Sequence, residues 1–221
     1  MTVALAFRTA LGETYRNSLR LLALNSLLSA TVAAVVFLVS AFPLVLFIAP
    51  LVAGPIVAAL VHCVVTLVRE ESFTLRDDAV AGLRMHWRRG FALGGLFGAG
   101  LLLGVVGVAF YVSPGHRVWP LAAVAIYMLT LFALVLLMAW PLAIASPERP
   151  LVEALRDAML ILFRAPSRTL SFGAGLFLIN LLGAVTVLPL LMLTISYSFL
   201  AAAHVVLPLP AQEEVTTQWQ A

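Results

Sequence analysis

The sequence contains no lysine and very little charge of either sign. All 13 basic residues among its 221 positions are arginine, and the four charged residue types make up only 10% of the chain. A soluble domain carries about 25% charged residues, because its surface faces water. The composition therefore excludes an ordinary soluble enzyme, and a net charge of only +3 gives no strongly basic surface for nucleic acid.

Several chemical signatures are also missing. The single cysteine, Cys63, lies in an apolar run, so there is no disulfide framework. The sequence has no Gly-x-Ser-x-Gly, no His-Glu-x-x-His and no phosphate-binding Walker loop. Cys63, His86 and His204 are not spaced like metal ligands. We therefore expect no catalytic residue, no cofactor and no metal site.

Charge is absent from four long stretches, residues 21–68, 90–116, 118–147 and 169–212. A bilayer core is roughly 30 Å thick and a helix rises about 1.5 Å per residue, so each shorter stretch fits one span. Each longer stretch, at roughly 72 and 66 Å if helical, fits a two-helix hairpin. The sequence predicts an all-α polytopic protein, a single membrane domain over residues 1–221. Its six transmembrane helices are expected at about 21–42, 47–68, 91–112, 121–143, 170–188 and 190–209.

The arginines predict the orientation of these spans. With six spans, the N-terminal segment, the 69–90 and 146–168 loops and the C-terminal tail share one side. That side holds 12 of the 13 arginines, and only Arg117 lies opposite. Because positively charged loops stay in the cytoplasm, both termini are predicted to be cytoplasmic.

A common pattern precedes each predicted hairpin. In each case three residues are spaced by four positions, the last of them is aromatic, and an arginine follows it. The trios are Phe7, Leu11 and Tyr15 with Arg16; Ala79, Leu83 and Trp87 with Arg88; and Leu155, Met159 and Phe163 with Arg164. This spacing keeps each trio on one helical face. We expect short interfacial amphipathic helices at about 4–17, 74–88 and 151–164. Each begins one of three parallel-oriented hairpin repeats, unless every junction between loop and span shares this pattern.

The predicted spans contain no Asp, Glu or Arg, although ion-coupled carriers usually place a charge near the midplane. The candidate polar residues of the bundle are Asn25, His62, Tyr127, Asn180 and Tyr197. Asn25 and Asn180 are expected to join helices, at about 1 kcal/mol each. For His62, an interhelical bond is favoured over a proton relay. The glycines at 90, 94 and 98, and at 100 and 104, favour packing inside the bundle over dimerisation.

Several loop segments resemble the YesL-like family of bacterial integral membrane proteins. The similarity lies in Ala53–Gly54–Pro55, Leu67–Val68–Arg69, His86–Trp87–Arg88–Arg89, Glu153–Ala154–Leu155–Arg156–Asp157–Ala158 and Arg164–Ala165–Pro166–Ser167–Arg168. It covers roughly residues 10–205, and Glu70 replaces the usual glycine. The resemblance implies a multi-pass protein of the bacterial plasma membrane, often found alongside carbohydrate-uptake systems. It supplies no catalytic residues.

These observations predict a non-enzymatic accessory to solute uptake, most simply of carbohydrate. Its expected partners are the lipid bilayer and components of an ABC-type transporter, and the sequence is compatible with a homo-oligomer. The candidate cytoplasmic contact surface comprises Tyr15, Arg16, Trp87, Arg88, Arg89, Phe163, Arg164 and Arg168. One alternative is a small transporter or channel for a neutral or amphiphilic solute that passes between the hairpins. Another is an intramembrane enzyme.

Overall fold

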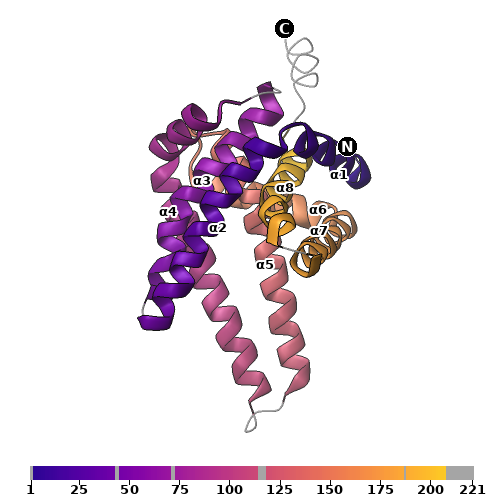
Figure 1. The fold of residues 1–221 in the computed structure, drawn as a ribbon. Coiled ribbons are helices and arrows are strands. Elements are labelled where there is room, and N and C mark those ends of the chain that lie inside the picture. The colour runs from indigo at the N-terminus through magenta and orange to yellow at the C-terminus, as the bar shows by residue number, and fades with distance from the viewer. Residues whose placement is uncertain (1, 43–44, 71–72, 114–117, 187, 208–221) are drawn as a thin grey trace.

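The part of the chain that the computed structural model describes consists of helices joined by short connections, with no strand. It comprises residues 2–42, 45–70, 73–113, 118–186 and 188–207. The predicted all-α fold class is thereby confirmed. The helices, labelled in Figure 1, are α1 (Val3–Arg16), α2 (Ser18–Ala41), α3 (Val45–Glu70), α4 (Leu75–Val112), α5 (Trp119–Ala145), α6 (Leu151–Arg164), α7 (Pro166–Thr186) and α8 (Leu188–Val206).

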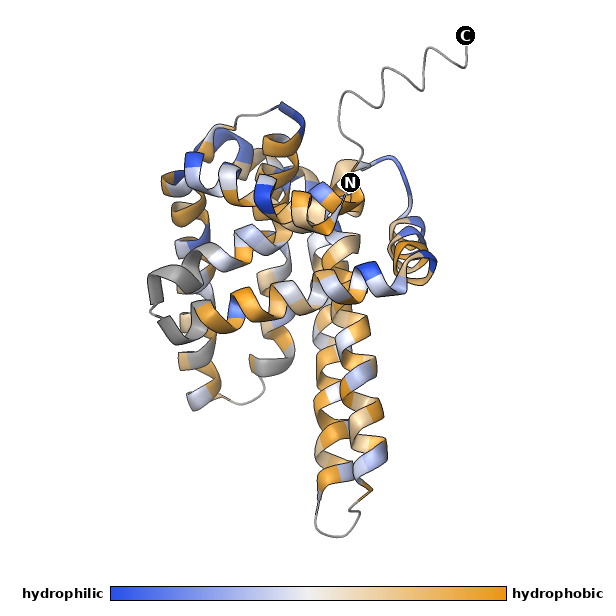
Figure 2. Ribbon diagram, turned by 90° about the vertical axis from the view of Figure 1, so that its right-hand side faces the viewer, coloured by the Kyte–Doolittle hydropathy of each residue, from blue (hydrophilic) through white to orange (hydrophobic). Residues whose placement is uncertain are grey.

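Four of these helices are long and apolar enough to cross a membrane: α2, α3 from Ile48 onward, α4 and α5. Their length and apolar composition support the prediction of a membrane protein. The remaining two predicted spans, 170–188 and 190–209, are not confirmed. Helix α7 is seen end-on in Figure 1 and lies horizontally in Figure 2, so it runs across α5 and not along it.

Residues 75–112 form one continuous helix, which corrects the predicted division into an interfacial helix at 74–88 and a span at 91–112. Its 38 residues extend about 57 Å, well beyond a bilayer core of roughly 30 Å. The helix begins at Thr74, whose backbone N–H donates to the Asp78 carboxylate at 2.6 Å. It continues because no proline interrupts it, so the change from charged to apolar residues near Arg89 does not end the helix.

The other interfacial segments do end, and each has a local cause. Asn17 separates α1 from α2, and both its backbone N–H and its side-chain amide donate to the Glu13 carbonyl. This amide capping is typical of a helix C-terminus. Pro166 separates α6 from α7, because proline disfavours helical geometry at Ala165 and suits the first position of a new helix.

Helices α3 and α4 approach each other closely through glycines. A Cβ atom added to Gly90 would lie 2.7 Å from Pro55 Cα and 2.8 Å from the Gly54 carbonyl oxygen. Gly94 likewise faces the backbone of Pro50 and Gly54, and Gly98 faces the Pro50 ring. These contacts allow backbone to pack on backbone, so the stripe of Gly90, Gly94 and Gly98 serves internal packing.

The second glycine pair of α4 has the same role toward α5. Gly100 faces the ring of Phe132, and Gly104 faces the side chain of Leu129. Small residues on α4 thus receive large residues of α5. Both glycine patterns seen in the sequence are accounted for within one chain.

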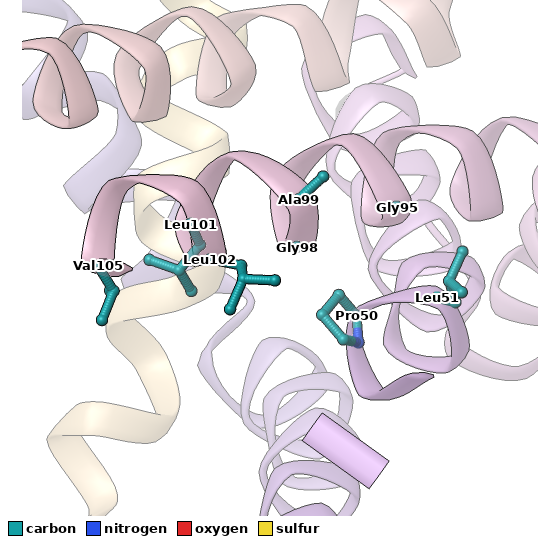
Figure 3. Close-up of a pocket in the computed structure, with 8 residues that line it drawn as sticks. All are labelled: Pro50, Leu51, Gly95, Gly98, Ala99, Leu101, Leu102 and Val105. Atoms are coloured by element: carbon teal, nitrogen blue, oxygen red, sulfur yellow. The ribbon is translucent and has the colours of Figure 1, made fainter. Parts of the chain in front are cut away.

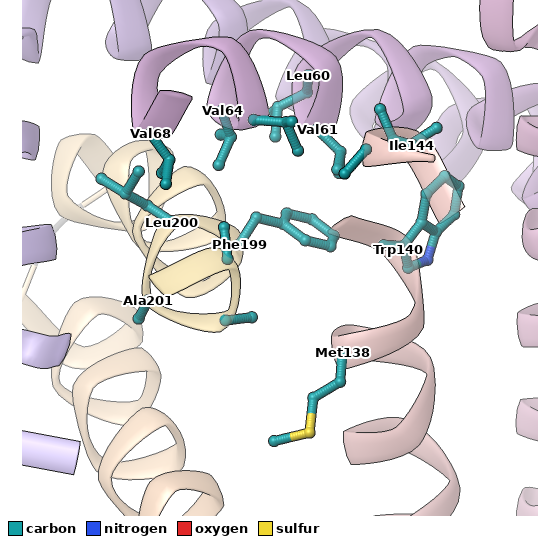
Figure 4. Close-up of a cluster of buried hydrophobic side chains, with 14 of the residues drawn as sticks. Leu60, Val61, Val64, Val68, Met138, Trp140, Ile144, Phe199, Leu200 and Ala201 are labelled. Atoms are coloured by element: carbon teal, nitrogen blue, oxygen red, sulfur yellow. The ribbon is translucent and has the colours of Figure 1, made fainter. Parts of the chain in front are cut away.

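The core lies where α3, α5 and α8 meet, and each of these helices contacts the other two. Figure 4 shows Val61 and Val64 of α3, Trp140 and Ile144 of α5, and Phe199 of α8 within this cluster. The Trp140 and Phe199 rings pack edge to face at 6.3 Å. The next turn of α8, Leu200 to Ala203, is fully buried. Its three alanines allow α8 to lie close to its neighbours.

The charged residues gather toward one end of the molecule. In Figure 2, hydrophilic residues (blue) occupy mainly the end that holds α1 and the start of α4, whereas the far part of the α4–α5 hairpin is mostly hydrophobic (orange). The α2–α3 and α4–α5 hairpins point away from that end in the same direction (Figure 1). This separation is what a bilayer requires of a chain that crosses it.

Candidate functional site

Two asparagines join α8 to its neighbours. Asn25 of α2 is fully buried, and its Oδ1 accepts a hydrogen bond from the Ser196 backbone N–H at 3.3 Å. Asn180 of α7 donates from Nδ2 to the Ser198 hydroxyl at 3.0 Å and to the Leu176 carbonyl at 2.8 Å. These are the helix-to-helix contacts that the sequence favours for both amides. The Nδ2 of Asn25 has no hydrogen-bond partner among the described residues.

Tyr197 links α8 to α1. Its hydroxyl donates to the Phe7 carbonyl at 3.2 Å, and its ring stacks on the Phe7 ring at 6.3 Å. On its other side, Phe7 stacks on Phe172 of α7 at 5.4 Å. An aromatic row therefore connects α1, α7 and α8, and Phe7 belongs to the interior of the fold.

His62 packs against the first part of α4. Its ring lies 5.2 Å from the His86 ring, centre to centre. A Cβ added to Gly82 would lie 2.7 Å from His62 Cβ, so Gly82 makes room for this imidazole. His86 is almost fully buried, and its Nδ1 has no partner among the described residues. The pair fixes α3 against α4, consistent with an interhelical role for His62.

Tyr127 does not belong to this interior. It is 50% exposed on α5. The prediction that it is a polar residue of the bundle is therefore wrong. An amphipathic ring on the outside of an apolar helix suits contact with lipid near the bilayer surface.

Most of the predicted cytoplasmic surface residues are exposed. Tyr15 is 84% and Phe163 71% exposed, while Trp87 is 45% exposed and carries the Arg88 guanidinium over its ring at 5.2 Å. Arg16, Arg164 and Arg168 are also exposed. Aromatic and guanidinium groups side by side suit either lipid headgroups or a protein partner.

Arg89 is the exception, because it turns inward. Its guanidinium donates to the carbonyls of Ala143, Ser146, Pro147 and Arg149, at the end of α5 and in the following loop. The last carbonyls of a helix lack partners within it, and a cation there is favourable. Arg89 is therefore a structural cap and not part of the exposed contact surface.

A second arginine makes a similar contact. Arg20, at the start of α2, donates to the Phe73 carbonyl beyond the end of α3 at 2.8 Å, and its guanidinium lies over the Phe73 ring at 5.8 Å. In both hairpins, an arginine of the first helix thus holds the segment that leaves the second helix, although Arg20 lies at the start of α2 and Arg89 lies well inside α4. The sequence analysis missed this relationship, although both arginines directly precede an apolar run.

Sequence reasoning also missed the contact between Glu13 and His204. The Nε2 of His204 lies 2.8 Å from Oε2 of Glu13, and the pair joins α1 to α8 across 191 positions. Both groups are largely withdrawn from solvent. The only sequence signal was that His204 and His62 follow similar alanine-containing segments.

Two apolar cavities, each about 380 Å³, lie between the helices. One lies between Pro50 and Leu51 of α3 and the Gly95–Val105 segment of α4 (Figure 3). The other is surrounded by α2, α3, α4, α5 and α8, with Phe97, Trp140 and Phe199 in its wall. Its one hydroxyl, on Thr31, donates to the Leu27 carbonyl. Both cavities have almost entirely apolar linings.

A third, smaller pocket differs in having arginines in its lining. It measures about 230 Å³, and its lining includes Arg164, Arg168, Met138 and Phe172. Across the described segments, the structure groups no set of histidine, cysteine and carboxylate side chains that could hold a metal ion. Comparison with known proteins finds no match to this chain among family models, curated proteins or solved structures.

Proposed function

We propose that this chain is a multi-pass protein of the bacterial plasma membrane that acts, without catalysis of its own, as an accessory to solute uptake. The resemblance to the YesL-like family motivates carbohydrate as the solute and an ABC-type transporter as the partner. The observation that carries the proposal is which polar side chains hold helices together and which are exposed. Asn25 and Asn180 bind α8, whereas the aromatic residues of the predicted contact surface and the arginines that follow them are exposed.

The proposed arrangement has six spans with both termini in the cytoplasm. The charge-free stretch 169–212 is long enough for two crossings in addition to the four long helices. Whether or not these two further segments cross the membrane, the total number of crossings is even. The cytoplasmic position of both termini therefore depends on the arginine distribution and not on the direction of α7.

The proposed threefold repeat is supported by the order of helix contacts. The second helix of each hairpin packs on the segment that begins the next unit: α3 on α4, α5 on α6, and α8 on α1. His62 makes the first of these contacts and His204 the last. A closed ring of three similar units would place α3, α5 and α8 at its centre, where they meet.

The exposed aromatic residues provide the contact surface in this proposal. Tyr15, Trp87 and Phe163 occupy corresponding positions of the three units, each followed by an arginine. Aromatic and arginine residues are enriched at the centres of protein interfaces. Three such groups, one in each unit, would suit the cytoplasmic side of a transporter.

The alternative, a transporter for an amphiphilic solute, is favoured by one observation. The second 380 Å³ cavity lies among five helices, including all three at the core. Its lining is almost entirely apolar and therefore suits an alkyl or ring system better than a sugar. A neutral polar solute is therefore the weaker candidate for direct transport.

Co-purification from native membranes tests the accessory role. The full chain, gently solubilised, is expected to retain a transporter permease or ATPase, and replacing Tyr15, Trp87 and Phe163 together by alanine should abolish that association. A matched triple change on the lipid-facing hairpin, at Leu103, Val106 and Met128, should leave it intact. Recovery of the chain alone, or association that the first triple does not alter, would contradict the proposal.

A further inference from the structure

The cavity surrounded by α2, α3, α4, α5 and α8 retains accessible surface on several of its walls. Val35 of α2 and both Ala53 and Val57 of α3 line it and are partly exposed, and Phe97 of α4 is 41% exposed. Trp140 of α5 also lines the cavity but is only 5% exposed. A molecule in this space would therefore contact accessible apolar surface and one nearly buried indole.

The cavity lies beside the glycine contacts between α3 and α4. Gly54 and Gly94 belong to its lining, and a Cβ added to Gly94 would lie 2.9 Å from the Gly54 Cα. The neighbouring wall residues of α3, Ala49 and Ala53, are also small. Small residues that let two helix backbones touch leave volume beside the contact that their own side chains do not fill. The space is therefore a consequence of how α3 packs on α4.

The lining disfavours water as the occupant. It is almost entirely apolar, no charged side chain belongs to it among the described residues, and the Thr31 hydroxyl already donates to the Leu27 carbonyl. A buried water needs roughly two to four polar partners, and cavities lined by hydrocarbon stay dry. An empty cavity, however, loses dispersion contacts along its walls. A hydrocarbon group is therefore the occupant that this lining favours.

A bilayer supplies such a group at high local concentration. Helices α2, α3 from Ile48 onward, α4 and α5 are long and apolar enough to cross a membrane, and all four contribute to the cavity wall. We propose that the cavity binds one acyl chain of a bilayer phospholipid, which lies against Val35, Ala53 and Phe97 while its headgroup stays outside. The volume of about 380 Å³ falls within the roughly 300–1,000 Å³ of ligand pockets. The site does not depend on the proposed role in uptake, because it requires only that these helices lie in a bilayer.

Trp140 can report directly on the occupant. The full chain, with Trp87→Phe, Trp119→Phe and Trp219→Phe, is reconstituted in phosphatidylcholine whose chains carry bromine near the headgroup, midway or near the end. Bromine quenches indole fluorescence only at short range. Although Trp140 is only 5% exposed, its fluorescence should be strongly quenched by at least one of these lipids. A companion chain with Leu103→Trp as its only tryptophan is the reference, because Leu103 is 73% exposed on α4.

Filling the cavity should displace the chain. Ala53→Leu and Val35→Phe enlarge side chains on two different walls. Each should remove most of the quenching of Trp140 and leave that of the Leu103→Trp reference unchanged. Ala123→Leu is the matched control, since Ala123 is exposed on α5 and does not line the cavity. Thermal unfolding checks that each variant is folded, and quenching of Trp140 in the unfilled chain decides the proposal if neither filled variant folds.

A brominated fatty acid, added to vesicles of unbrominated phosphatidylcholine, distinguishes the two sources of an alkyl chain. Quenching of Trp140 by brominated phosphatidylcholine supports the phospholipid site, whereas quenching by the fatty acid alone would overturn it. The proposal also fails if no brominated lipid quenches Trp140, if both filled variants retain the quenching, or if water-soluble acrylamide quenches Trp140 as strongly as free tryptophan. None of these readouts requires a transporter, so the uptake proposal can fail separately.

Discussion

Glu13 and His204 lie 2.8 Å apart, Oε2 to Nε2, and they connect the first helix of the chain to the last. The glutamate side chain is 16% and the histidine 2% exposed, so neither is well hydrated. A hydrogen bond to a charged group of this kind contributes about 1.5–3 kcal/mol. The contact is therefore a principal link between α1 and α8, alongside Tyr197 and the Phe7 carbonyl.

Replacing Glu13 by alanine should destabilise the folded protein by about 1.5–3 kcal/mol, because His204 would lose its partner while remaining buried. Glu13→Gln keeps an acceptor oxygen and should cost less. Glu148→Ala, in an exposed loop, serves as the control. Thermal unfolding in detergent measures the effect. His204→Ala and the double variant complete a double-mutant cycle. If the loss of stability in the double variant equals the sum of the losses in Glu13→Ala and His204→Ala, the two residues do not interact as the structure indicates.

Gly90→Ala should also destabilise the protein, here by overpacking. The new methyl group would meet Pro55 Cα and the Gly54 carbonyl, both backbone atoms that cannot rotate away. Such overpacking typically costs about 1–3 kcal/mol.

Gly107→Ala, on the same helix, is a control that should raise the stability of the protein. Nothing lies within 4 Å of a Cβ added there, so the gain in helix propensity of about 1 kcal/mol remains. Thermal unfolding of both variants under identical conditions should therefore shift in opposite directions. A Gly90→Ala protein as stable as the parent would show that α3 and α4 are not in backbone contact.

Arg89→Gln should loosen the end of α5, because one guanidinium serves four carbonyl groups there. We expect a loss of about 2 kcal/mol and faster cleavage after Glu148 by a glutamyl endopeptidase. Arg88→Gln is the matched control, since Arg88 is exposed over Trp87. Arg89→Lys should restore the protein only in part, because an ammonium group lacks the planar fork. Equal cleavage of both glutamine variants would contradict the capping role.

Local features of the sequence predicted much of this fold. Charge-free runs of sufficient length predicted the long helices, because a bilayer core sets a minimum length. The glycine spacing predicted close helix contacts, and Gly90, Gly100 and their partners make them. Asn25 and Asn180 were expected between helices because an unpaired amide is costly in an apolar setting.

Other features could not be read from local patterns. The charged-to-apolar boundary near Arg89 marks a change of surroundings, whereas a helix ends only where backbone geometry or hydrogen bonding changes. Pro166 supplies such a change between α6 and α7, and no residue does so within α4. Tyr127 was misplaced because a polar ring on an apolar helix can face either lipid or a bundle. Long-range pairs such as Glu13 with His204 require the arrangement of the helices.

The direction of α7 leads to a test of the number of crossings. Single cysteines can be introduced in a Cys63→Ala background at Val187, between α7 and α8, and labelled from each side of the membrane. If the chain crosses six times, a cysteine at position 187 should be labelled from outside, as should the Gly115→Cys control.

Arg84→Cys and Arg164→Cys should both be labelled from the cytoplasm, as should the Glu148→Cys control. Labelling of position 187 from the cytoplasm would show four crossings, with α7 lying across the bundle at the membrane surface. Labelling of Arg84 and Arg164 from opposite sides would contradict both arrangements, since the arginine-rich segments would no longer share a compartment.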